Sequence, residues 1–494
     1  MKEREFIDIG SYPQFSLQAE GGWSDRIVGG VGCNFFLGRK GNLPPFSDKR
    51  KWRKIDSFLR DLKIGMLRIG FLPSGSGDVA GDAASISPWD DRLQNYDFKN
   101  DFFKVLKYLD TLAGELKFPI MIDPWWIPRS MQIEQPGESG TSHRGAPSDL
   151  NLYAEKYVMP LVTHSVDKLK CKNIKYLGLL NEPVWNQDDR NPGNFTVKEG
   201  DDQLKVLSEM YSEVRNSLDS AGFTQIKIIG PSALCAYQFP MSDFLASGVD
   251  PTPYLGALDH HYYMYHLDSA SPPNDEFFST HETVDGNIRR WCDFAKRKKL
   301  PFMITEMGSF AYGRLFWGEK DMEGPASHTC AVSDAQFIVR SLARGVQSFL
   351  RWTFSVPEHF DGRWSIVEWN EKDVYPTPNI YPMYRELMRS IRPGCQVMKV
   401  KVGYSAGRRS PVHAVATKYG SEINLLIVND EPGKNHDVIV GNGPWSGMTF
   451  NRIIVDETRK GSRIQPVKFP SDPAKGAEFV LTPYSLTVLT NRKG

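Results

Sequence analysis

The chain has 494 residues, 40% of them hydrophobic and 24% charged, and its formal net charge is +1. This length exceeds what one ordinary hydrophobic core supports, so we expect one large domain with a smaller domain beside it. The balanced charge gives no support for a nucleic-acid partner or an acidic membrane partner.

The N-terminus and the cysteines set further bounds. Residues 1–6 lack the apolar segment of a signal peptide, so we expect a cytoplasmic protein or a secreted one shown without its leader. The six cysteines show neither CxxC nor zinc-ligand spacing, which favours buried free thiols over disulfides. None of these features indicates an oligomeric state.

From about residue 27 to 392, short apolar or β-branched runs alternate with longer segments of helical period. This alternation predicts the α/β class and, with eight strands, a (β/α)8 barrel. The predicted strands are Ile27–Val31, Ile64–Phe71, Phe118–Ile122, Ile174–Leu180, Ile226–Ile229, Leu255–His261, Phe302–Thr305 and Val346–Trp352. The clearest predicted helices are Phe102–Leu116, Leu152–Leu169, Asp202–Asp219 and Ala335–Ala343.

After Ile391–Gly394 the pattern changes to alternating segments separated by Gly, Pro, Asn and Lys turns, among them Glu422–Asn429, Asp437–Val440 and Leu486–Thr490. That pattern predicts a small antiparallel β-sandwich. We therefore expect an N-terminal segment at 1–22 that could add a strand to the sandwich, a barrel at 23–393 and the sandwich at 394–494.

Two short motifs place a carboxylate where a predicted strand ends. Asn181-Glu182-Pro183 follows the fourth strand, and Glu306-Met307-Gly308 follows the seventh. Active sites of such barrels lie at the carboxyl ends of the strands, so Glu182 and Glu306 are expected to face one cleft. Two carboxylates in one cleft are the minimal equipment for cleaving a glycosidic bond.

The Asn-Glu-Pro motif after strand four, with a glutamate after strand seven, resembles clan A of the glycoside hydrolases, which are retaining barrel enzymes. The trailing sandwich resembles the accessory domain of families 30, 39 and 51, and the exact family stays open. The resemblance implies that Glu182 is the acid/base and Glu306 the nucleophile. It also implies that the Asn181 amide contacts the sugar 2-hydroxyl and that the carboxyl groups lie about 5–5.5 Å apart.

Other positions fit the same resemblance. Arg68, near the end of strand two, resembles the arginine that hydrogen-bonds the nucleophile. His261 and Tyr263, at the end of strand six, match the His-x-Tyr pattern of the clan, although the doubled sequence leaves His260 with Tyr262 as an alternative. Expected aromatic neighbours of the sugar are Trp352 on strand eight, Trp125 and Trp126 after strand three, and Trp185 after the acid.

Other chemistries lack support in the sequence. The chain has no P-loop, HExxH or G-x-S-x-G motif, so we expect neither a metal nor another cofactor. The function expected is a retaining β-glycoside hydrolase acting on a β-glycoside, an oligosaccharide or a polysaccharide. The alternatives are a non-catalytic carbohydrate-binding barrel, a transglycosylase with the same glutamates, and a barrel enzyme of unrelated chemistry such as a metal-dependent lyase. The long segments 71–99, 123–150 and 307–333 leave exo and endo action open.

Overall fold

The computed structural model of the protein describes residues 15–37, 43–73, 87–133, 145–183, 195, 197–198, 200–234, 243, 246–266, 281–311, 326–358, 364–403, 410–441, 443–472 and 475–493. The five cysteines within these ranges are free. Trp185 and Cys235 lie outside the described residues.

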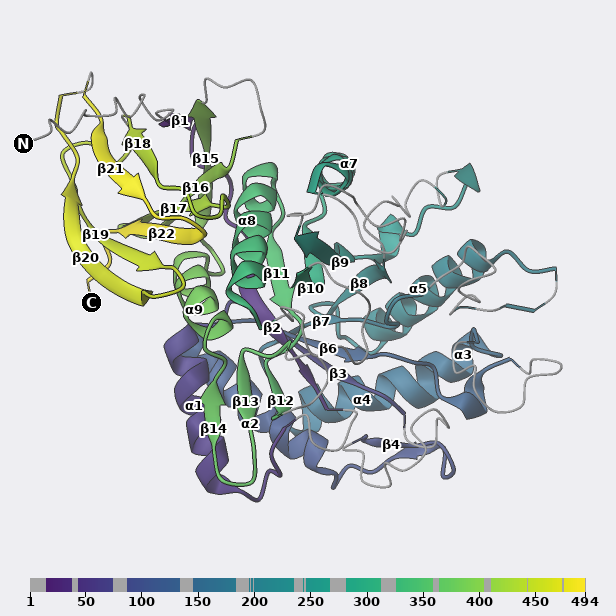
Figure 1. Ribbon diagram of the computed structural model, residues 1–494. Coiled ribbons are helices and arrows are strands. Elements are labelled where there is room, and N and C mark those ends of the chain that lie inside the picture. Colours follow the sequence, from purple (N-terminus) through teal and green to yellow (C-terminus); the bar gives the residue numbers. More distant parts are fainter. Residues whose placement is uncertain are drawn as a thin grey trace, which may run out of the picture.

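Eight parallel strands close into a barrel at the centre of the molecule (Figure 1). In order they are β2 (Gly30–Phe36), β3 (Leu67–Phe71), β6 (Ile120–Pro124), β7 (Ile174–Leu177), β8 (Lys227–Leu234), β9 (Ala257–His266), β10 (Phe302–Ala311) and β11 (Ser348–Arg351). All eight predicted strands overlap one of these. The predicted (β/α)8 barrel is therefore confirmed.

Each of the eight strands differs from its predicted bounds at one or both ends, and three of these differences affect the start of the barrel and the two glutamate motifs. The first strand was placed at Ile27–Val31, but Ile27 hydrogen-bonds Cys395 in the connection to the C-terminal sheet and β2 begins only at Gly30. The fourth strand ends three residues earlier than predicted, at Leu177. The seventh continues to Ala311, well beyond the predicted end at Thr305. Glu306 therefore lies within a strand and not after it.

Helices cover the outside of the barrel (Figure 1). They are α1 (Lys49–Leu62), α2 (Asp101–Leu116), α5 (Gln203–Ser220), α7 (His281–Lys298), α8 (His328–Arg344), α9 (Ile380–Ser390) and a continuous helix over 150–168 made of α3 (Leu150–Leu152), η2 (Tyr153–Val158), α4 (Met159–Thr163) and η3 (His164–Lys168). Side-chain caps fix several starts: Asn100, Asp202 and Ser327 each accept a hydrogen bond from a backbone N–H of the first turn. Single turns of 3₁₀ helix stand at η1 (Arg129–Met131) and η4 (Thr252–Tyr254).

The C-terminal strands form one nine-stranded sheet that curls over its own core (Figure 1). Its members are β1 (Phe15–Glu20), β15 (Gln396–Gly403), β16 (Val412–Tyr419), β17 (Glu422–Asn429), β18 (His436–Val440), β19 (Thr449–Val455), β20 (Lys460–Lys468), β21 (Ala477–Leu481) and β22 (Ser485–Thr490). β1 pairs with β15 and β18, so the N-terminal segment joins this sheet. The barrel with a C-terminal β-sandwich is thus the observed architecture.

Two small sheets lie outside these domains, and neither was predicted. One is a hairpin of β4 (Trp89–Asp90) and β5 (Asn95–Tyr96). The other joins β12 (Ser355–Pro357), β13 (Val367–Trp369) and β14 (Val374–Pro376) after the eighth barrel strand. Within the part of the chain described, every helix is too short or too polar to cross a membrane.

The barrel interior changes from apolar to polar along its axis. Near the amino ends of the strands it holds a cluster of its own, formed by Met66, Met121, Tyr176, Ile229, Ala257, Met303 and Leu350. Near the carboxyl ends the buried inward positions are charged or polar, and they include Arg68, Asp123, His261 and Glu306. Charged groups are rarely buried unless they are paired, so this end of the barrel is the candidate functional site.

Candidate active site

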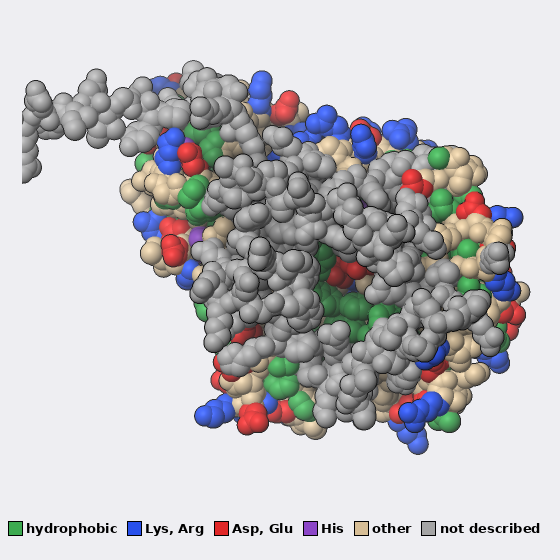
Figure 2. Space-filling model, turned by 45° about the vertical axis from the view of Figure 1, so that its right-hand side comes forward, with side chains coloured by type: hydrophobic (Ala, Val, Ile, Leu, Met, Phe, Trp, Pro, Cys, Tyr) green, Lys and Arg blue, Asp and Glu red, His purple; other side chains and the backbone are tan. Residues whose placement is uncertain are grey.

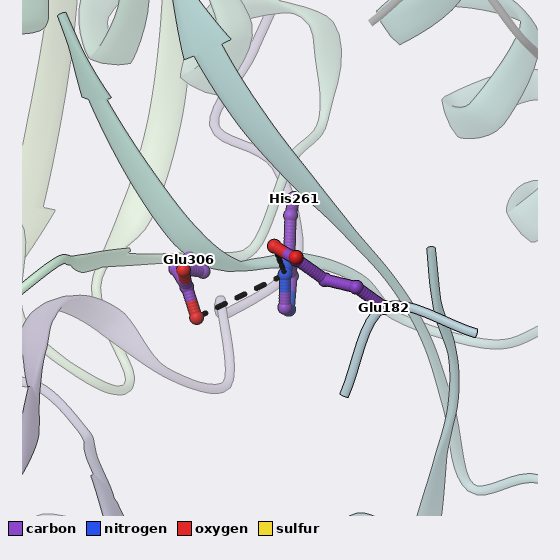
Figure 3. Close-up of side chains that lie close together, drawn as sticks. All are labelled: Glu182, His261 and Glu306. Atoms are coloured by element: carbon purple, nitrogen blue, oxygen red, sulfur yellow. Dashed lines mark hydrogen bonds and ion pairs between the residues drawn. The ribbon is translucent and has the colours of Figure 1, made fainter. Parts of the chain in front are cut away.

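The two predicted glutamates lie beside each other at the carboxyl end of the barrel. One oxygen of Glu182, Nδ1 of His261 and one oxygen of Glu306 all lie within 4.8 Å of one another. Figure 3 shows both carboxylates directed toward the imidazole, Glu182 from the loop after β7 and Glu306 from β10. The side chain of Glu182 is 22% exposed and that of Glu306 is 7% exposed, so the first is the more open to solvent.

A β-bulge turns Glu306 toward the barrel interior. Met303 belongs to the interior cluster and Ile304 to the outer core, so regular alternation would make Glu306 face outward. The pairing of β10 with β9 shifts register between Ile304 and Glu306, which inserts one extra residue, Thr305. The next side chain, Glu306, therefore faces inward.

Asp259 secures the backbone beside both glutamates. Its buried carboxylate accepts hydrogen bonds from the Ser232 N–H and hydroxyl, both at 2.7 Å, and from the Thr305 hydroxyl at 2.6 Å. The carbonyl of Ser232 in turn accepts the N–H of Glu182 at 3.1 Å. That contact steadies Glu182 at its positive φ of 52°.

Arg68 donates four hydrogen bonds to Glu306 and the groups around it. Nη1 donates to Glu306 Oε2 at 2.7 Å and to Asn34 Oδ1 at 3.1 Å. Nη2 donates to Asn181 Oδ1 at 2.6 Å. Nε and Nη2 both contact Asp123 Oδ2, at 2.6 and 2.5 Å. Four hydrogen bonds and the ion pairs with Asp123 and Glu306 fix the guanidinium in one orientation although its side chain is fully buried.

The charge of this cluster is set by burial and by the two acids. Burial alone lowers the pKa of Arg68, but the carboxylates of Asp123 and Glu306 raise it above its ordinary value, so the guanidinium stays charged. Burial raises the pKa of Asp123 to about 6, against the opposite effect of Arg68. Two acids thus share one permanent cation.

The guanidinium also decides which way Asn181 faces. Arg68 has only donors, so the atom that contacts it must be Oδ1 of the Asn181 amide. The NH2 group of the amide is then directed away from the guanidinium. The expected contact with a sugar 2-hydroxyl requires this orientation if the amide is to donate.

Tyr263 donates a hydrogen bond from its hydroxyl to Glu306 Oε1. Burial, and then the charge of Glu306, raise the pKa of Tyr263 well above its usual value, so the hydroxyl remains a donor at working pH. His260 and Tyr262 face the other side of β9, where they pack on Trp291 and Phe337. Of the two registers left open by the sequence, the structure therefore brings His261 and Tyr263 to the glutamates.

Replacing Tyr263 by phenylalanine should lower kcat/KM for a glycoside substrate on the order of 100-fold, because Glu306 loses one of its two strong donors. Loss of a donor to the ionised form makes the carboxylate easier to protonate, so the acid limb of the pH profile should move to higher pH. Y262F, the same change on the opposite face of β9, is the control and should leave the limb in place. A Y263F limb at the wild-type position would contradict the assigned contact.

His261 is a neutral neighbour of Glu182. Burial lowers its pKa to about 4, and its Nδ1 lies 2.9 Å from Glu182 Oε1. Among the described residues Nε2 has no hydrogen-bond partner, so no second hydrogen bond fixes the tautomer. A neutral imidazole can accept from a protonated Glu182 or donate to an ionised one. The contact therefore suits a carboxyl group that changes protonation state.

Three aromatic rings form one side of the site. Trp125 stacks on Phe36 at 4.2 Å between ring centroids, and Trp352 lies 5.3 Å from Trp125 and 5.9 Å from Phe36. The Arg68 guanidinium lies 5.4 Å from the Trp125 ring, a cation–π contact. Trp125 and Trp352 are both only partly buried. Figure 2 shows a hollow in this face of the molecule, with acidic and hydrophobic side chains at its base.

The two remaining predicted tryptophans are Trp126 and Trp185. The Trp126 carbonyl accepts a hydrogen bond from the Tyr157 hydroxyl at 3.3 Å, which fastens the loop after β6 to the helix over 150–168. Trp185 lies outside the described residues, as do residues 74–86, 134–144 and 312–325 of the long segments that could line the cleft.

Sequence reasoning missed Asn34, Phe36, Asp123 and Asp259 as members of the site. Asn34 accepts from Arg68 through Oδ1, and its NH2 group contacts the carbonyls of Thr305, Leu350 and Arg351. The available signal was a polar residue inside an apolar strand, as in Cys33-Asn34-Phe35 and Ile122-Asp123-Pro124. Such residues need a buried partner, and around a parallel barrel the partner lies on a neighbouring strand.

Glu182, His261 and Glu306 form the only group that could hold a metal ion within the described parts of the chain. Glu306 already pairs with Arg68, so a divalent ion bound there would face the positive charge of the guanidinium. The donor set suits proton transfer and nucleophilic attack better than metal binding.

Solved structures with the same fold are known, although no sequence match is found. Neither the protein-family models nor the curated protein sequences contain a match to this chain. Among solved structures, the catalytic domain of the GH30 xylanase C from Talaromyces cellulolyticus matches with a TM-score of 0.63 at 15% identity, over 97% of this chain and 100% of that one. This chain has the fold of family 30 glycoside hydrolases.

Two further structures with the same fold show how widely it extends. SrfJ from Salmonella typhimurium matches with a TM-score of 0.65 at 12% identity, over 100% of this chain and 94% of that one. An endo-beta1,6-glucanase matches with a TM-score of 0.59 at 12% identity, over 97% and 94%. The predicted resemblance to clan A is confirmed at the level of the fold, and the exact family stays open.

Proposed function

We propose that this protein is a retaining β-glycoside hydrolase that acts on a β-glycoside, an oligosaccharide or a polysaccharide by double displacement. The observation that carries the proposal is the separation of the two glutamates, whose nearest oxygens lie within 4.8 Å. Retaining enzymes hold their carboxyl groups about 5–5.5 Å apart, whereas inverting enzymes need about 6.5–9.5 Å to admit a water molecule. A separation near 9 Å would have contradicted the mechanism.

In the first step Glu306 attacks the anomeric carbon. The bond from that carbon to the leaving oxygen breaks, and the leaving oxygen takes a proton from Glu182. Arg68 and Tyr263 donate to the two oxygens of Glu306, which supports its ionised form before attack. The product of this step is a glycosyl ester of Glu306.

In the second step Glu182, now ionised, removes a proton from water as the water attacks the anomeric carbon. The ester bond breaks, the sugar leaves with its original configuration and both glutamates return to their starting states. The greater exposure of Glu182 suits this role, because it must reach both the leaving group and water.

The substrate is proposed only as a class. A xylanase and an endo-beta1,6-glucanase are named among the structural neighbours, which supports a β-linked sugar polymer or fragment. The aromatic side formed by Phe36, Trp125 and Trp352 provides a surface on which a sugar ring can stack.

Turnover of aryl β-glycosides and β-linked polysaccharides, followed by proton NMR of the anomeric signal, tests the proposal. The β-anomer should appear first and the α-anomer only later through mutarotation, because two displacements preserve configuration. First appearance of the α-anomer would exclude the double displacement. Calorimetric binding of oligosaccharides without turnover would instead indicate the non-catalytic barrel.

A further inference from the structure

Asp123 lies on the opposite edge of Arg68 from the proposed nucleophile. Glu306 contacts Nη1, whereas Asp123 contacts the edge formed by Nε and Nη2. Both partners of this second pair have fully buried side chains. The guanidinium therefore bridges two carboxylates, only one of which takes part in the proposed chemistry.

The carboxylate of Asp123 has little freedom to move. A Cβ atom at Gly178 would lie 2.2 Å from its Oδ1, so the backbone of the neighbouring segment leaves room only for glycine. Within the described residues Oδ1 has no hydrogen-bond partner, and the contacts of this side chain are concentrated on Arg68 through Oδ2. An ionised Asp123 carboxylate in this position loses its hydration shell, which costs free energy.

We propose that Asp123 is a positioning residue that serves as the permanent counter-charge of Arg68 through the catalytic cycle. The inference rests on the proposed function, because it follows from the change in charge on Glu306. Formation of the glycosyl ester converts the Glu306 carboxylate into a neutral group. Without Asp123, Arg68 would then be a buried cation with no charged partner. Asp123 keeps the guanidinium neutralised and in place until hydrolysis restores the carboxylate.

The same arrangement affects the free enzyme. Since Arg68 is shared, it stabilises the Glu306 carboxylate less than an exclusive partner would, which leaves Glu306 more nucleophilic. Asp123 is ionised above about pH 6, so this sharing operates at neutral pH and weakens as the solution becomes more acidic. His261, Tyr263 and Asp259 are ionisable groups near this pair, and Glu182 adjoins it through His261. Asp123 also has three buried tyrosines around it, Tyr153, Tyr157 and Tyr211, whose pKa values burial raises and whose hydroxyl groups stay protonated. His261 is neutral and Tyr263 protonated over the same range.

The test is the pH dependence of kcat/KM for D123N with an aryl β-glycoside that the wild type hydrolyses. Loss of the negative charge should make Glu306 harder to protonate, so the acid limb should move to lower pH. The plateau should fall about 10- to 100-fold, because Arg68 stabilises the ground-state carboxylate more strongly. This direction is opposite to that expected for Y263F.

D334N is the matched control, since Asp334 on α8 forms another fully buried pair with an arginine, Arg351. Within the described residues its carboxylate is also bound by Ser309 and Tyr384 and by none of the predicted site residues. This variant should lower thermal stability and leave the acid limb at the wild-type pH. If D123N does not fold, D123S, whose smaller side chain leaves room for water, is measured in the same way. An acid limb at the wild-type position in a folded Asp123 variant would overturn the inference.

A second measurement separates the two chemical steps. The enzyme is trapped with a 2-deoxy-2-fluoro glycosyl fluoride, and recovery of activity reports hydrolysis of the ester. In D123N this hydrolysis should be as fast as in the wild type or faster, because it returns a partner to Arg68. Slowing of both steps by a similar factor would indicate general distortion and overturn the inference. A wild type without any glycosidase activity would overturn the proposed function and this inference together.

Discussion

Replacing Glu306 by glutamine is expected to abolish turnover of an aryl β-glycoside, with kcat lowered on the order of 10⁵-fold or more. The amide is nearly isosteric but cannot form the glycosyl ester, and it also loses the charge that pairs with Arg68. Steady-state kinetics with a chromogenic substrate, together with mass spectrometry of the 2-fluoro-glycosyl adduct, measure the effect. The adduct should form in the wild type and be absent from E306Q.

The control for this change is E386Q. Glu386 is likewise nearly fully buried and pairs with an arginine, Arg492, but it lies on α9 against the C-terminal sheet. This variant should keep its activity and report only the stability cost of neutralising a buried glutamate. Wild-type turnover by E306Q with the fold intact would remove Glu306 from the mechanism.

Replacing Glu182 by alanine is expected to affect substrates according to their leaving groups. A dinitrophenyl glycoside needs little help from an acid, so the first step should be nearly unchanged, whereas an alkyl glycoside should lose about 10²- to 10⁴-fold in kcat/KM. The second step should become slow for every substrate, because no base remains to deprotonate the water. The glycosyl-enzyme then accumulates, and both kcat and KM fall.

Sodium azide should restore kcat of E182A with the dinitrophenyl substrate, because it attacks the ester without base catalysis and gives a β-glycosyl azide. E422A, which removes a similarly half-buried glutamate paired with Arg392 in the C-terminal sheet, should neither lose activity nor respond to azide. An α-configured azide product would contradict the assignment of Glu182. So would a uniform loss across leaving groups.

The fold could be predicted in large part from local patterns. Each barrel strand carries a run of apolar residues long enough to be recognised, and each predicted helix has an apolar stripe of helical period. The strands that were missed, such as β4, β5 and β12–β14, have two or three residues, too few for a period to appear. The errors at strand ends arise because residue type alone does not show where strand pairing stops. Ile27, for example, is as apolar as its neighbours, but its backbone N–H donates to the carbonyl of Cys395.

The candidate site could be predicted where chemistry is carried by short motifs. Asn181-Glu182-Pro183 and Glu306-Met307-Gly308 identified two carboxylates, and the strand count placed them at one end of the barrel. Their proximity follows from that count, and their roles stay predictions that the glutamate variants test. Arg68 and the His261–Tyr263 pair were found through resemblance, since one arginine and one doubled His-Tyr pattern carry little information alone.

The sequence by itself determined the barrel and the trailing sandwich and singled out Glu182 and Glu306 as candidates, because these depend on residue type and local period. Only the tertiary structure decided which way the groups face. The bulge at Thr305 turns Glu306 inward against the alternation of its strand. Asp123 meets Arg68 across two neighbouring strands, 55 residues apart in the chain. Register and long-range pairing arise from packing between strands, so the two glutamates acquired their surroundings only when the barrel closed.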